Sequence, residues 1–333
     1  MLKLVKKLRT TGPEIIFLIF VVALVTWIGA FIQPQPLSEA GFDIEPMPFF
    51  DLLLSVVGFN HLLSTITAFV LLLFLSFLLV NLNTNLFFIS ERTFLPAILY
   101  VSITGLYTDQ QILNPVIPAA LFLILAMKKI MDSYQVHGTA YSFFDAGMLI
   151  SIGSLFYASL IWFGILLIAG LVILRTGAIK EFAITIIGMI TPLFIVYGIY
   201  YVTGSDMNNL LSAVAYNLFE REPEYIMPGY LVIISIISSI VIFVCLFHLL
   251  SAINTKKIKS RKTFTLLFWI FLIAITLYLI FGSVSIEIIW IAAIPAVYII
   301  SHYFVFARSR IIPEVLLMTI IIMMIVVQVV RYL

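Results

Sequence analysis

The sequence carries little charge. Only 10% of its 333 residues are charged, whereas soluble domains carry about a quarter. Hydrophobic residues make up 63% of the chain, and the mean hydropathy is +1.20. A soluble chain of this composition could not cover its surface with polar groups. We therefore expect a lipid bilayer to surround most of the protein.

Cysteine and metal-binding patterns are nearly absent as well. The single cysteine, Cys245, lies inside an apolar run, which excludes a disulfide or a cysteine-based metal site within one chain. The sequence contains no phosphate-binding glycine loop, nucleophile elbow or zinc motif. The histidines have no spacing typical of a metal site: His61, His137, His248 and His302. The sequence therefore names no metal site and leaves any cofactor unknown.

The basic N-terminus precedes an apolar stretch, as it does in a signal peptide. No small-x-small cleavage site follows Ile32, and the chain continues with Gln33-Pro34-Gln35-Pro36. We expect this stretch to remain in the protein as its first membrane span.

Long apolar runs continue to the end of the sequence. Because a helix needs roughly 20 apolar residues to cross a bilayer, the runs predict an all-α, polytopic transmembrane helical bundle of about eleven spans. We expect the spans at residues 14–32, 61–80, 94–107, 115–127, 143–157, 159–174, 182–203, 229–252, 264–281, 286–306 and 313–330.

The basic residues predict which side each loop occupies. Loops on the cytoplasmic side of a membrane are rich in lysine and arginine. If the N-terminus is cytoplasmic and the spans alternate, all 18 lysines and arginines except Arg221 and Arg331 lie on the cytoplasmic side. This distribution predicts a multi-pass protein with a cytoplasmic N-terminus, and it places most acidic residues outside.

Two outer segments divide the chain. We predict an N-terminal transmembrane module at residues 1–203, with a first outer loop at 33–60 in which residues 49–59 form an interfacial helix. The second outer segment, 204–228, connects this module to a C-terminal transmembrane bundle at 229–333. We expect the connecting segment to cap a cavity between the two modules.

Charged residues in these outer segments are the candidate site residues. Asp43 and Glu45 could hold a divalent cation through their oxygens, or one could act as a general base toward a hydroxyl. They could equally belong to a solvated acidic loop. Arg221 lies between Glu220 and Glu222. It could bind a phosphate or carboxylate through two hydrogen bonds, or it could pair with its neighbours.

Three stretches between residues 81 and 203 carry a resemblance to a known family. They are Asn85–Tyr100, the run that follows Asn114-Pro115, and Phe144-Asp145-Ala146-Gly147 continuing to Tyr157. They resemble an uncharacterised family of bacterial polytopic inner-membrane proteins, a domain of unknown function. The resemblance implies a bacterial inner-membrane location and no particular activity.

The order of spans and loops also resembles the N-terminal module of GT-C-type glycosyltransferases. Those enzymes transfer a sugar from a polyprenyl-phosphate carrier at the outer face of the membrane. In them a carboxylate of the first outer loop is often the base or a metal ligand, and Asp43 and Glu45 fall in the matching loop. Many have an acidic residue at the second outer turn. Here Asn114-Pro115 occupies that place, and the nearest acid is Asp109.

The resemblance makes a transferase for polyprenyl-phosphate-linked sugars at the periplasmic face the first functional hypothesis. It implies Asp43 or Glu45 as the catalytic residue, with Arg221, Asp109 and Asn114 binding substrate. One alternative is a non-catalytic subunit of a cell-envelope assembly. Another is a lipid or solute transporter, which the lack of a repeated half and of charges within spans disfavours. Expected partners are membrane lipids and other envelope proteins, with no nucleic acid.

Overall fold

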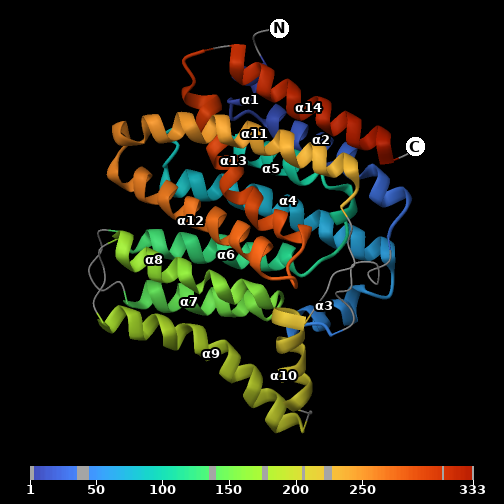
Figure 1. Ribbon diagram of the computed structural model, residues 1–333, viewed down its shortest axis with the longest axis vertical. Coiled ribbons are helices and arrows are strands. Elements are labelled where there is room, and N and C mark those ends of the chain that lie inside the picture. The colour runs from blue at the N-terminus through green and yellow to red at the C-terminus, as the bar shows by residue number, and fades with distance from the viewer. Residues whose placement is uncertain are drawn as a thin grey trace.

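The computed structural model describes residues 4–35, 45–134, 140–174, 179–204, 207–220, 227–309 and 311–331. Within these ranges the protein is helical and contains no β-strand, which confirms the predicted all-α class (Figure 1). The helices are α1 (Leu4–Leu8), α2 (Pro13–Ile32), α3 (Pro48–Val57), α4 (His61–Leu86), α5 (Leu95–Thr104), α6 (Val116–Asp132), α7 (Ala140–Ser154), α8 (Gly164–Leu174), α9 (Ile179–Thr203), α10 (Met207–Ala215), α11 (Gly229–Ala252), α12 (Ile258–Ile280), α13 (Ile289–Phe306) and α14 (Ile311–Arg331).

Shorter helical turns connect several of these helices. Four are 3₁₀ turns: η2 (Thr108–Gln110), η3 (Ala158–Phe163), η5 (Ile253–Thr255) and η6 (Ile286–Ile288). The turn η4 (Tyr216–Glu220) is π-helical. A helix is present where one was expected at residues 49–59: α3 buries Phe50 and Val57 and exposes Asp51, and its place at the membrane interface stays a prediction.

In the described ranges, seven helices are long and apolar enough to cross a membrane: α2, α4, α9, α11, α12, α13 and α14. The chain is therefore a multi-pass membrane protein. The other four predicted spans correspond to α5, α6, α7 and α8, which have between 10 and 17 residues. Eleven full crossings therefore remain a prediction.

The long helices lie side by side, so the bundle has two end faces (Figure 1). We call the end at which α2 and α14 finish the Arg331 face. The opposite end, where α11 turns into α12, is the Lys256 face. At the Lys256 face, one ion pair joins the α1–α2 connection to the α4–α5 connection, and another joins α6 to α7. Arg9 donates two hydrogen bonds to Glu91, of 2.7 and 2.9 Å, and Lys129 Nζ lies 2.7 Å from Asp145 Oδ2.

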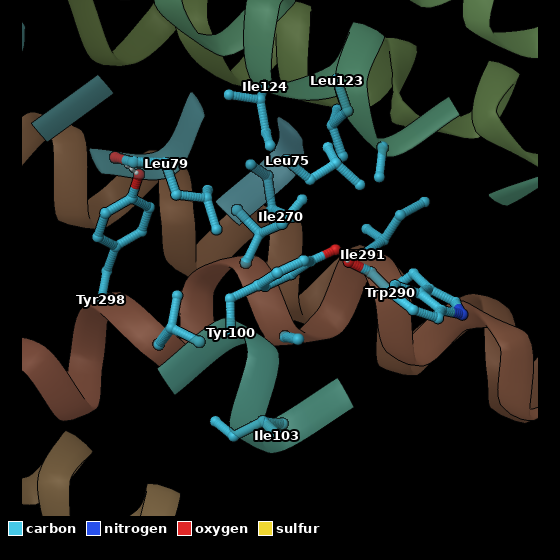
Figure 2. Packing of buried hydrophobic residues seen from close by; sticks show 14 of the residues in the cluster. Leu75, Leu79, Tyr100, Ile103, Leu123, Ile124, Ile270, Trp290, Ile291 and Tyr298 are labelled. Atoms are coloured by element: carbon cyan, nitrogen blue, oxygen red, sulfur yellow. Dashed lines mark hydrogen bonds between the residues drawn. The ribbon is translucent and has the colours of Figure 1, made fainter. Parts of the chain in front are cut away.

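Helix α13 forms the centre of the bundle. In its membrane-length segment 89% of the residues are buried, whereas the share is 22–44% in the other six membrane-length helices. The Tyr100 hydroxyl of α5 donates to the Trp290 carbonyl at 2.9 Å, and the Tyr298 hydroxyl donates to the Leu79 carbonyl of α4 at 2.7 Å (Figure 2). These bonds tie α13 to helices from the first third of the chain.

Helices α7 and α9 approach each other through glycine. A Cβ atom on Gly188 of α9 would lie 2.4 Å from the carbonyl oxygen of Phe144 in α7. A Cβ atom on Gly147 of α7 would lie 2.7 Å from the carbonyl oxygen of Thr185 in α9. Small residues let membrane helices approach backbone to backbone, so these two glycines fix the position of α9.

Candidate functional site

The site is built on the tip of the α5–α6 hairpin, residues 105–115. Helix α5 has only 10 residues and ends beside α2, where a Cβ atom on Gly105 would lie 2.9 Å from Thr26 Cβ. Helix α2 continues for six residues beyond Thr26 to Ile32. At 1.5 Å per residue, α5 therefore ends about 9 Å short of the end of α2, and the tip begins there. Its polar residues lie within the bundle, below the Arg331 face.

The tip is held to α2 and α14 by amide and guanidinium groups. Gln111 Nε2 donates to the Thr26 carbonyl at 2.8 Å, and Gln328 Nε2 donates to the same oxygen at 2.8 Å. Arg331 Nη1 donates to Gln111 Oε1 at 2.8 Å. The Oε1 atom of Gln328 is buried and has no hydrogen-bond partner among the described residues. One acceptor thus remains for a donor group of a ligand.

A carboxylate lies on the same tip. Asp109 Oδ1 accepts from Thr108 Oγ1 at 3.2 Å and from the Tyr230 hydroxyl of α11 at 3.4 Å. Arg331 bonds Gln111, which is two positions from Asp109 on the same tip, so opposite charges share one region. We call the group Thr26, Asp109, Gln111, Tyr230, Gln328 and Arg331 the tip cluster.

An apolar groove leads to the tip cluster. This first groove has a volume of about 780 Å³ and lies between α2, α5 and α14. Along α14 it extends from Leu317 to Val329, which corresponds to about 18 Å of helix. Its polar lining residues are Thr26, Ser102 and Gln328, and two of these belong to the tip cluster. The volume is in the range of small-molecule sites, which is about 300–1,000 Å³.

A second groove lies on the other side of α5. Its volume is about 710 Å³, and residues of α11, α12 and α13 line most of it. Ile103 and Tyr107 close it on the hairpin side, and the Tyr107 hydroxyl lies 3.1 Å from Ser235 Oγ of α11. Helix α5 therefore lies between the two grooves, and the tip adjoins the second one through Tyr107.

The structure places the predicted site residues in different surroundings. Asp109 belongs to the tip cluster. Asn114 is fully buried, and its Oδ1 accepts from the backbone N–H groups of Val116 and Ile117, so it caps α6. The carbonyl oxygen of Glu45 accepts from Asn217 Nδ2 at 2.6 Å. Its Oε2 atom is buried without a hydrogen-bond partner in the described ranges.

Two of the predicted residues, Asp43 and Arg221, lie outside the described residues, so their predicted roles stay predictions. The described part of the chain contains no group of three or more His, Cys, Asp and Glu side chains that could hold a metal ion. The tip cluster itself has one carboxylate, so hydrogen bonding and charge are its means of holding a ligand.

Sequence reasoning missed Arg331, Gln111, Gln328 and Tyr230. A signal for Arg331 was present, because it is one of two basic residues on the predicted outer side. The two glutamines are polar residues next to strongly apolar runs. No pattern in the sequence indicated that residues so far apart would meet.

A second polar group lies near the Lys256 face. His302 is fully buried, and neither ring nitrogen has a hydrogen-bond partner in the described part of the chain. Its ring lies 6.0 Å from that of His248 and 4.8 Å from Phe306, centroid to centroid. Lys256 Nζ lies 3.1 Å above the Phe306 ring, and burial lowers the pKa of this lysine. Aromatic rings enclose His302, so the tip cluster is the more accessible candidate site.

Comparison with known protein families identifies the family of this chain. Residues 42–333 match the model of a family described as a family of unknown function, DUF6427. No curated protein and no solved structure matches the chain. The match covers most of the sequence and names no activity, which leaves the tip cluster and its grooves as the basis for a function.

Proposed function

We propose that this chain, which belongs to the family of unknown function DUF6427, binds an anionic lipid or lipid-linked molecule at the Arg331 face. The observation that carries the proposal is the first groove, which is apolar along its length and ends at the tip cluster. An apolar chain fits the groove, and an anionic head would lie at Arg331. Arginine suits this role because its guanidinium binds phosphate through two hydrogen bonds.

The proposed orientation follows from the distribution of basic residues. With the Lys256 face in the cytoplasm, the basic loops lie inside, as membrane proteins prefer. The tip cluster then lies near the periplasmic side of a bacterial inner membrane. Lipids of the outer leaflet would reach the first groove from the side, between α2 and α14.

Blocking the first groove tests the proposal. Ile325 lines this groove, whereas Ile322 lies on the same helix outside its lining, and both side chains are 59% exposed. We expect Ile325→Trp to weaken binding of phosphatidylglycerol by about tenfold, or about 1.4 kcal/mol, because the indole occupies the space of the lipid chain. Ile322→Trp should bind as the wild type does.

The measurement is the lipid-dependent increase in thermal unfolding temperature of the protein in detergent, with phosphatidylcholine as the uncharged comparison. Equal responses of the two tryptophan variants would contradict the proposed groove. Equal responses of the wild type to both lipids would contradict the preference for an anionic head.

The transferase hypothesis fits the same site and assigns a role to Asp109. Its carboxylate would accept the proton of an acceptor hydroxyl, whose oxygen forms a bond to the anomeric carbon of the sugar. The bond from that carbon to the carrier phosphate breaks, and Arg331 would pair with the departing phosphate. The tip cluster supports this arrangement because it includes both a carboxylate, Asp109, and a guanidinium, Arg331. Asp43 and Glu45 remain the alternative bases.

Replacing Asp109 with asparagine separates binding from transfer. We expect Asp109→Asn to keep phosphatidylglycerol binding within a few-fold of wild type and to lower sugar transfer by about 10²–10⁴-fold, the typical contribution of a general base. Transfer is measured with a radiolabelled sugar on a polyprenyl-phosphate carrier in proteoliposomes. If Glu45→Gln or Asp43→Asn abolishes transfer and Asp109→Asn does not, the base lies in the first loop. No transfer by the wild type would favour a non-catalytic role.

A further inference from the structure

We infer that the second groove binds a second amphiphile, one with an uncharged, hydroxyl-bearing head, so that two lipids meet at the hairpin tip. The inference rests on the proposed function of the first groove. It assigns a ligand class to a cavity that the first ligand does not use.

The position of the second groove favours a lipid as its occupant. Helices α11 and α12 both pack on α13 and leave the cavity of about 710 Å³ between them. Ile236, Ile240 and Phe243 of α11 line the cavity and also have more than half of their side chains exposed on the apolar surface. An apolar chain from the surrounding bilayer would therefore continue from the surface into the groove without crossing a polar layer.

The polar lining favours a head without charge. None of the residues that line the second groove is charged, and the polar side chains among them are all hydroxyls: Tyr107, Ser235, Ser238, Ser239 and Tyr278. The Ser238 Oγ atom is buried and has no hydrogen-bond partner among the described residues. An ion would lose its hydration here without gaining a counter-charge, which is costly. A hydroxyl group would gain a bond to Ser238.

The two grooves share α5 as their common wall. Ser102 lines the first groove, and the next residue, Ile103, lines the second. At the tip, Tyr107 lines the second groove, whereas Gln111 contacts Thr26 of the first. These two residues are four positions apart, so their Cα atoms are no more than about 14 Å apart even in an extended chain. Asp109 lies between them. Two lipid heads would thus lie on either side of Asp109.

Matched variants on α11 test the inference. Ile236 lines the second groove and Ile233 does not, while their exposed fractions are 56% and 60%. The probes are phosphatidylglycerol and diacylglycerol, and the measurement is native mass spectrometry of the purified protein with each lipid and with both. We expect the wild type to carry one molecule of each. Ile236→Trp should bind diacylglycerol at least about tenfold more weakly and keep phosphatidylglycerol. Ile233→Trp should keep both.

The failure of the second site can be distinguished from the failure of the proposed function. Unchanged diacylglycerol binding by Ile236→Trp would overturn the second site, even if Ile325→Trp still loses phosphatidylglycerol and the proposed function stands. Competition between the two lipids for one position in the wild type would also overturn it. If Ile325→Trp keeps phosphatidylglycerol while Ile236→Trp loses it, the anionic lipid occupies the second groove, and both proposals fail.

Discussion

Replacing Gly188 with leucine is expected to detach α9 from α7. A Cβ atom at this position would lie 2.4 Å from the carbonyl oxygen of Phe144 and 3.1 Å from its Cα atom. Both atoms belong to the backbone of α7, so no side-chain rotation relieves the overlap. Overpacking of a core costs about 1–3 kcal/mol where side chains can adjust, and we expect a loss at or above the upper end. The measurement is the thermal unfolding temperature in detergent.

Gly198 provides a matched control in the same helix. No atom lies within 4 Å of the position that a Cβ atom would take there. Both substitutions exchange glycine for a stronger helix former, so the gain in helix propensity is shared. Gly198→Leu should therefore unfold at or above the wild-type temperature. If Gly188→Leu and Gly198→Leu unfold at the same temperature, α7 and α9 do not pack through Gly188.

The second large effect is expected from Arg331→Gln. The substitution keeps a hydrogen-bond donor for Gln111 and removes the charge that would face an anionic head. Hydrogen bonds to charged groups contribute about 1.5–3 kcal/mol, so phosphatidylglycerol should bind about 10–100-fold more weakly, with phosphatidylcholine unaffected. Titration of each lipid against the purified protein gives the two dissociation constants.

Two further variants show whether Arg331 acts from its position or only by its charge. A Cβ atom on Gly29 would lie 2.8–2.9 Å from Nε, Cζ and Nη1 of Arg331. Gly29→Ala should move the guanidinium and weaken phosphatidylglycerol binding while leaving stability unchanged, since a flexible side chain can yield. Lys257→Gln removes an exposed cation at the other face. If it weakens binding as much as Arg331→Gln, non-specific attraction accounts for the affinity.

The positions of the helices could be predicted from the sequence because lipid-exposed helices must be apolar along their length. The residues at which the helices end could not be predicted as well from hydropathy. The second span was predicted at residues 61–80, yet α4 continues to Leu86. The extra residues include Asn81, Asn83 and Asn85, which hydropathy assigns to a loop. Asn83 is buried, and its side-chain amide bonds the backbone of Ile89 and Glu91.

The depth of the hairpin tip could not be predicted either. An apolar run at residues 94–107 indicates a helix and cannot show how far it extends across the bundle. That distance is set by the contact of Gly105 with Thr26, which joins segments far apart in the chain. The layout of loops indicates both Asp109 and Asn114 as candidate substrate-binding residues. Their surroundings differ because one faces α11 and the other caps α6.

The composition of the tip cluster depends on tertiary packing. Gln328 and Thr26 are 302 positions apart, and Arg331 and Gln111 are 220 apart. Each residue alone is an ordinary polar group inside or next to an apolar run. The packing of α14 against both α2 and the hairpin tip makes them neighbours.

The central position of α13 has a consequence for how the protein is made. Ribosomes deliver a chain from its N-terminus, so α4, α5, α11 and α12 enter the membrane before α13 is complete. Until then, the Tyr100 hydroxyl and the Leu79 carbonyl oxygen lack the α13 partners that they have in the finished protein. The core of the bundle is therefore completed late, when α13 takes its place among the helices that precede it. A chain released before residue 289 would retain most of its membrane helices and lack its centre.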